Sequence, residues 1–148
     1  MEPTLHCARP AYGCGAARED RVVAVPYGDS KPQRGDIVVF QTPPLARTRC
    51  GAGGFFIKRV IGLPHETWRE HAGVVFIGGR PLREPYIRPD RRDHLNFKGG
   101  PIPAGRYLLL GDNRVSSCDS RVYGLVPRGD LRGKVVQILR RSKRIHLR

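Results

Sequence analysis

One lysine lies inside an apolar run: Lys58 in "FFIKRVIGL", residues 55–63. Burying an unpaired ammonium group costs several kcal/mol, so this side chain must either reach solvent or lose its proton. Desolvation can lower a lysine pKa from about 10.4 by about 3 to 5 units, which makes the amine a general base near neutral pH. The alternative is an ordinary lysine whose stem packs on apolar groups while its charge stays in water.

A lysine base needs a nucleophile, and the chain has few serines. Three of its five serines lie in "RVSSCDSR", residues 114–121. A Ser–Lys pair is a known variant of serine catalysis, in which the amine does the work of the histidine in a triad. The alternative for this cluster is a hydrogen-bonded turn in which Asp119 and Arg121 form an ordinary ion pair.

The elements that must position these residues are short strands. Three runs rich in Val, Ile and Phe, at residues 21–25, 36–40 and 54–63, predict strands that pair antiparallel. Alternation along a strand places Lys58 on the same face as Phe56 and Val60. Residues 73–82 predict a hairpin that turns at Gly78 and Gly79. An irregular charged segment follows, then a strand and turn within residues 106–121, and strands at 123–127 and 133–139.

Composition favours a β-rich protein of one domain. The chain has 148 residues with 18 Gly and 13 Pro, and it contains no internal repeat. The pattern divides it into a core, residues 1–64 and 102–148, and an insertion of about residues 65–101. No apolar stretch approaches the roughly 20 residues that a membrane span requires.

The chain is strongly basic, with 27 Lys and Arg against 13 Asp and Glu and a net charge of +14. Such a charge attracts polyanionic surfaces, either nucleic acid or anionic lipid. One alternative function is therefore a non-catalytic basic β-domain that binds nucleic acid or an anionic membrane. No specific nucleic-acid motif is present. The densest run, "RRSKRIHLR" at residues 140–148, can also be a simple solvated segment.

The four cysteines, Cys7, Cys14, Cys50 and Cys118, show no C-x-x-C spacing, which argues against a zinc ribbon or a thioredoxin motif. If they are oxidised, three pairings are possible, and one of them joins Cys7 to Cys14 and Cys50 to Cys118. Free buried thiols are the alternative. The histidines show no ligand spacing, so we expect neither a metal nor an organic cofactor.

Four stretches, in order, resemble the signature boxes of bacterial type I signal peptidases: "MEPTL" (residues 1–5), "RGDIVVF" (34–40), "KRVIGLP" (58–64) and "GDNRVSSCDSR" (111–121). The resemblance covers nearly the whole chain. It implies a mainly β fold, an antiparallel sheet or partly open barrel with a β-rich insertion. It also implies a serine endopeptidase that removes signal peptides from exported proteins by a Ser–Lys dyad.

The resemblance assigns roles by motif. Lys58 matches the general base, and Ser117 matches the serine that orients it. The residues expected to support the site are Arg34, Asp112, Asn113, Arg114, Asp119 and Arg121, with Asp36 in the same strand box as Arg34. The residues expected to contact substrate are Met1, Leu5, Phe56 and Ile57. Proximity of Cys118 to Ser117 suggests that a bond to Cys50 ties the last box to the lysine strand.

The printed sequence departs from the family at its start. The family's first box reads Ser-Met-x-Pro-Thr-Leu, and here Met1 comes first. We therefore expect the nucleophile, its oxyanion-hole neighbour and a membrane anchor to precede Met1 in a longer protein, and the chain as printed to be inactive. A catalytically dead remnant is the less favoured explanation.

The resemblance also implies a cellular location and partners. We expect a monomer anchored in the plasma membrane, with this domain on the extracytoplasmic face, that acts on the signal peptides of preproteins and contacts the membrane surface. Self-cleaving repressor domains also use a Ser–Lys dyad, but they need a cleavable segment in cis, and none is visible here.

Overall fold

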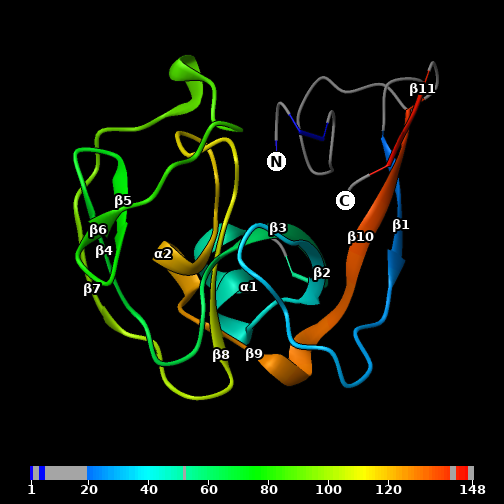
Figure 1. The fold of residues 1–148 in the computed structure, drawn as a ribbon, viewed down its shortest axis with the longest axis horizontal. Helices are drawn as coiled ribbons and strands as arrows, with labels where there is room; N and C mark the ends of the chain where they lie inside the picture. Colours follow the sequence, from blue (N-terminus) through cyan, green and yellow to red (C-terminus); the bar gives the residue numbers. More distant parts are fainter. Residues whose placement is uncertain (2–3, 6–19, 52, 141–142, 147–148) are drawn as a thin grey trace.

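Two antiparallel β-sheets build the protein (Figure 1). The computed structural model describes residues 1, 4–5, 20–51, 53–140 and 143–146. The first sheet has seven strands: β1 (Arg21–Val25), β2 (Ile37–Gln41), β3 (Phe55–Gly62), β8 (Arg106–Leu110), β9 (Val126–Pro127), β10 (Leu131–Arg140) and β11 (Lys143–His146). Their order is β1-β10-β2-β3-β8-β9, and β11 pairs with β10.

The second sheet has four strands in the order β6-β5-β4-β7. They are β4 (Thr67–His71), β5 (Val74–Ile77), β6 (Arg80–Pro81) and β7 (Phe97–Pro101). The helices are short: α1 (Pro44–Cys50), α2 (Ser120–Tyr123) and the 3₁₀ turns η2 (Pro89–Arg91) and η3 (Arg128–Asp130). Among the described residues, no helix is long and apolar enough to cross a bilayer.

The mainly β, antiparallel fold predicted from the sequence is confirmed. The hairpin at residues 74–81 is also present, with Gly78 at φ 55° and Gly79 at φ 79°, values that glycine adopts without strain. The second sheet lies entirely within residues 67–101, and we propose that residues 65–101 form an insertion in a core of residues 1–64 and 102–148.

Three local predictions were incomplete. β1 pairs with β10 and not with β2, because the ten-residue β10 reaches both. α1 was not predicted, since its seven residues carry too few apolar positions for a helical period; proline opens it, and Gly51, at φ 67°, ends it. The charged segment expected to be irregular contains β7.

The strand β3 contributes to three apolar clusters. Phe56 and Val60 face one cluster, which also holds Ala46 of α1 and Tyr123 of α2. On the other face, Ile57 and Ile61 join two further clusters. Lys58 therefore lies on the face of Phe56 and Val60, as the alternation predicts.

The second sheet depends on a glycine that a side chain cannot replace. Gly99 has φ 63°, and a Cβ built there would lie 2.0 Å from the main-chain oxygen of Trp68. We expect Gly99→Ala to lower the free energy of unfolding by more than about 1 kcal/mol, measured by chemical denaturation. Gly129→Ala is the matched control, because that position has no heavy atom within 4 Å. Equal stability of the two variants would contradict this account.

Candidate active site

The amine of Lys58 is kept from water without a counter-ion. Its side chain is partly buried on β3, and Nζ lies 5.5 Å from the centre of the Phe56 ring. Its amine forms no hydrogen bond or ion pair with any of the described residues. Burial lowers the pKa of Lys58 below its usual 10.5; the carboxylates of Asp119 and Asp112 oppose this shift, and Arg121 adds to it.

The hydroxyl of Ser117 lies beside this lysine. Ser117 Oγ is buried, and no described residue forms a hydrogen bond with it. Both side chains pack on Gly111: a Cβ built there would lie 2.1 Å from Ser117 Oγ and 3.6 Å from Lys58 Cδ. Buried hydroxyls nearly always have a hydrogen-bond partner. Because neither the Ser117 hydroxyl nor the nearby Lys58 amine has one among the described residues, we expect that the two can form a hydrogen bond with each other.

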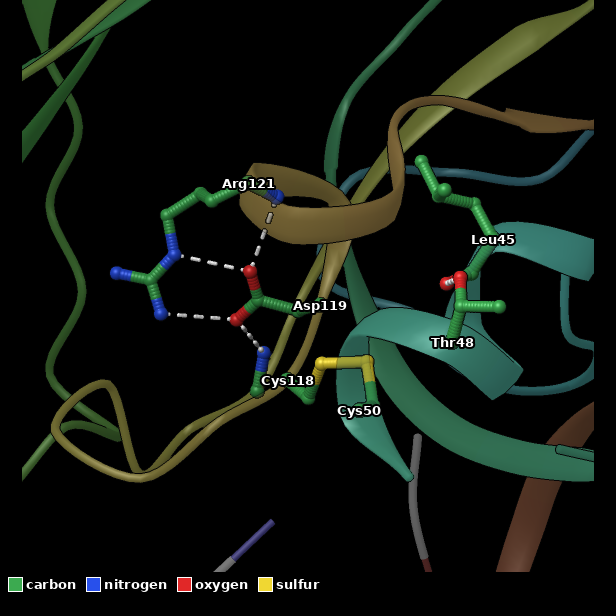
Figure 2. The surroundings of a disulfide bond; sticks show 7 residues. Leu45, Thr48, Cys50, Cys118, Asp119 and Arg121 are labelled. Atoms are coloured by element: carbon green, nitrogen blue, oxygen red, sulfur yellow. Dashed lines mark hydrogen bonds and ion pairs between the residues drawn. A yellow bond between two sulfur atoms is a disulfide. The ribbon is translucent and has the colours of Figure 1, made fainter. Parts of the chain in front are cut away.

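Asp119 and Arg121 brace the segment that carries Ser117 (Figure 2). Nε and Nη2 of Arg121 donate to the two oxygens of Asp119, at 2.9 Å each. The main-chain N–H of Arg121 also donates to Asp119, which caps α2. The N–H of Gly111 donates to the same carboxylate at 3.2 Å. Asp119 thus fixes Gly111, the residue on which the dyad packs.

Asp112 connects the amino-terminal box to β3. Nε and Nη2 of Arg59 donate to the two oxygens of Asp112 at 2.9 and 2.7 Å, and the hydroxyl of Thr4 donates to Oδ2. Arg59 also donates to the main-chain oxygen of Gly35 and stacks on the ring of Tyr86. Arg59 was not predicted from the sequence, although its position next to Lys58 and on the opposite face of the strand was a usable signal.

Carboxylates from the second sheet and its loops also reach the site. Nη1 of Arg121 donates to Asp93 at 2.6 Å and lies 3.4 Å from Glu70. Arg114 donates to Glu84 and to the main-chain oxygen of Gly111. These three acidic residues were not predicted, because they lie far from the last box in the chain, on β4 and in the loops of the second sheet.

Arg34 and Asp36 support β3 away from the dyad. Arg34 donates to the main-chain oxygen of Ile61 and to Glu66. Asp36 accepts from Tyr27 and pairs with Lys134. In the last box, the main-chain oxygen of Asn113 accepts from Ser116, whereas its side-chain oxygen is buried without a partner among the described residues.

Residues expected to contact substrate fall into two groups. Met1, Leu5 and Ile57 pack in one apolar cluster with Val135 and Ile138. Phe56 lies on the other face of β3, under Lys58. Leu5 is 2% exposed, so it lies inside the cluster and does not itself offer an open surface to a substrate.

The predicted bond between Cys50 and Cys118 is present, with a Cα–Cα distance of 5.9 Å (Figure 2). Cys7 and Cys14 lie outside the described residues. Within the described part of the chain, no group of three or more His, Cys, Asp and Glu side chains could hold a metal ion.

Known proteins similar to this chain show its family. Residues 1–139 match the family model "Signal peptidase, peptidase S26", and the chain belongs to this family. It is similar to signal peptidase I of Leptolyngbya laminosa, with 43% identity over 79% of this chain and 58% of the relative. The probable signal peptidase I-2 of Synechocystis sp. is 38% identical over 90% of this chain and 56% of the relative.

A crystal structure of a signal peptidase I from Enterococcus faecalis V583 is also similar. Its TM-score is 0.57 at 32% identity, and the match covers 71% of this chain and 97% of that one. The chain spans somewhat more than half the length of the curated relatives it matches.

Removing the Lys58 amine should change how stability depends on pH. The pKa of Lys58 is lower in the folded chain than in the unfolded chain. Between these two pKa values the unfolded chain binds more protons, so the free energy of unfolding rises with pH. The destabilisation caused by burying Lys58 therefore decreases as pH rises through this interval. Below the folded pKa the full cost remains. We expect Lys58→Met to be more stable than the parent at neutral pH, with a difference that shrinks toward pH 10.

This prediction is measured by urea denaturation between pH 6 and 10. Lys98→Met, which removes an exposed ammonium group, controls for the loss of one positive charge. A stability difference between Lys58→Met and the parent that stays constant across this pH range would show that Lys58 is not desolvated.

Proposed function

We propose that this chain supplies the catalytic domain of a serine endopeptidase that removes signal peptides from exported preproteins. The observation that carries the proposal is the desolvated amine of Lys58, which no described residue pairs, beside the buried hydroxyl of Ser117. Membership of the signal peptidase family supports the same activity. The proposed nucleophile is a serine directly before Met1, which the family pattern contains and the printed sequence does not include.

The position of Met1 supports this assignment. The main-chain oxygen of Met1 accepts from the N–H of Leu5 at 3.0 Å, which makes a tight turn. Leu5 is buried, and Thr4 donates to Asp112. Met1 itself packs in the cluster that contains Ile57, the neighbour of Lys58. A residue placed before Met1 would therefore start beside Ile57, next to Lys58 along β3.

The proposed mechanism follows from the state of the amine. Neutral Lys58 takes the proton of the serine hydroxyl as the oxygen attacks the peptide carbonyl, and it then gives that proton to the leaving amine. Water hydrolyses the acyl-enzyme by the same route. Ser117 holds the amine in line, while Asp112 and Asp119 stabilise the ammonium ion that forms during the reaction.

The substrate peptide would bind by strand addition along β3. β8 pairs with β3 only from Arg59 to Gly62, whereas β2 pairs with Phe55 to Arg59. Among the described residues, β8 therefore leaves the first part of β3 without a partner on that side. Alternate substrate side chains would meet Phe56 on one face of β3 and the cluster of Met1 and Ile57 on the other.

We also propose an extracytoplasmic position at the plasma membrane. The disulfide between Cys50 and Cys118 fits an oxidising compartment. The net charge of +14 favours contact with an anionic leaflet, where each basic side chain near the surface can add about 1 kcal/mol.

The decisive experiment restores the nucleophile. The full chain carrying a serine directly before Met1 should cleave a signal-peptide substrate, and Lys58→Ala in that protein should lower kcat by at least about a thousandfold, because the serine then has no base. Cleavage is measured by mass spectrometry of the products. Lys98→Ala, which removes an exposed lysine, should leave the rate unchanged.

Substantial cleavage by the Lys58→Ala protein would show that the base is misassigned. No cleavage by the serine-bearing parent, together with steeply salt-dependent binding to nucleic acid or anionic vesicles, would favour the non-catalytic basic domain instead.

A further inference from the structure

The two residues Ser117 and Cys118 form a segment that is held mainly at its ends. Before it, the N–H of Ser116 donates to the main-chain oxygen of Asn113 at 3.2 Å. After it, the carboxylate of Asp119 binds Gly111 and Arg121. Within the described chain, no residue forms a hydrogen bond with the Ser117 hydroxyl. Hydrogen bonding therefore does not fix the position of the one serine that lies beside Lys58.

A disulfide bond also holds this segment, at Cys118. Cys118, directly after Ser117, is bonded to Cys50, the last residue of α1 (Figure 2). The chain passes from Cys50 through residues 51–54 into β3, which carries Lys58. Both cysteines pack against the apolar cluster that contains Phe56. The disulfide thus joins the segment of the orienting serine to the approach of the lysine strand.

Gly111 limits the same segment from the opposite side. A Cβ built on Gly111 would lie 2.1 Å from Ser117 Oγ. The serine therefore packs tightly against the main chain of Gly111, directly after β8. The serine can move away from Gly111, but not through it. The covalent tether at Cys118 opposes that movement.

We propose that the Cys50–Cys118 disulfide is a positioning element of the dyad, which keeps the Ser117 hydroxyl against Gly111 and within reach of the Lys58 amine. This inference rests on the proposed peptidase function. Neither cysteine contacts the reacting atoms; the bond acts through Ser117.

Opening the bond has a defined chemical consequence. The charged groups around Lys58 are Asp112, Asp119 and Arg121, each of which keeps its own hydrogen-bonded partner when the disulfide is absent. What changes is the packing: when Ser117 leaves Gly111, water reaches the amine. The burial that lowers the pKa of Lys58 is then partly lost, so this pKa rises.

The test compares the serine-bearing chain with its Cys50→Ala/Cys118→Ala variant, at a temperature at which circular dichroism shows both to be folded. We expect kcat to fall at least about tenfold, since small misplacements of catalytic groups cost this much or more, with KM changed less than about twofold. The acid limb of the kcat profile should move to higher pH. Val115→Ala, an exposed change in the same loop, should alter neither quantity.

A double-mutant cycle separates positioning from general stability. Ser117→Ala should lower kcat when the disulfide is intact and should have little further effect in the variant without cysteines 50 and 118. A dithiol reagent reduces the disulfide to two thiols and is itself oxidised to a cyclic disulfide. Treating the parent with this reagent should lower kcat as the double substitution does, and reoxidation should restore it. The reagent should not affect the Cys50→Ala/Cys118→Ala variant.

The lysine can also be observed without catalysis. The ¹³Cε resonance of Lys58, titrated by NMR in the printed chain and in its Cys50→Ala/Cys118→Ala variant, should report a higher pKa in the variant. An unchanged kcat, an unchanged acid limb or additive effects in the cycle would overturn the positioning role. Absence of cleavage by the parent would overturn the peptidase function, and the NMR comparison would still decide the effect of the disulfide on Lys58.

Discussion

The constraint on which this site depends is the Lys58 amine, which is held out of water with no counter-ion among the described residues. Two carboxylates lie close enough to raise the pKa of Lys58, those of Asp119 and Asp112. Either of them, if free, would pair with the amine and keep it protonated. Each is instead bound by two nitrogens of an arginine, Arg121 for Asp119 and Arg59 for Asp112. The arginines therefore help keep the pKa of Lys58 low, because they occupy the carboxylates that would otherwise pair with its amine.

The same requirement explains why the second sheet contributes charge to the site. Arg121 is almost completely buried and has more donors than Asp119 can accept, so Asp93 and Glu70 take the remaining nitrogen. Arg114, 2% exposed, is matched by Glu84 in the same way. Burial raises the pKa of Glu70, and the neighbouring Arg121 and Arg114 act against this shift. Breaking one such pair would leave an uncompensated buried charge, which costs several kcal/mol.

Features that depend on residues close together in the sequence could be predicted, whereas contacts between residues far apart in the sequence could not. The apolar run placed Lys58 on the face of Phe56 and Val60, and the double glycine placed the hairpin, because both depend on local periodicity and backbone freedom. The family boxes indicated Ser117 and its neighbours. The partners Glu70, Glu84 and Asp93 were not predictable, since they meet the last box only after both sheets have formed. α1 was missed because its seven residues are too few for a periodic signal.

The register of β3 finally decides which cation lies beside Ser117. Lys58 and Arg59 are adjacent and point to opposite faces, and a slip of one residue would exchange them. The lysine would then meet Asp112 and stay charged, while a guanidinium that cannot lose its proton would occupy the dry site. The register shift between Val60 and Gly62 opposes this slip. A Cβ at Gly62 would lie 2.4 Å from Cδ1 of Ile102 and 3.0 Å from Cβ of Leu108, so a larger residue at this position would displace buried side chains. The packing of Gly62 against Ile102 and Leu108 thus helps to hold the register that places the lysine, and not the arginine, beside Ser117.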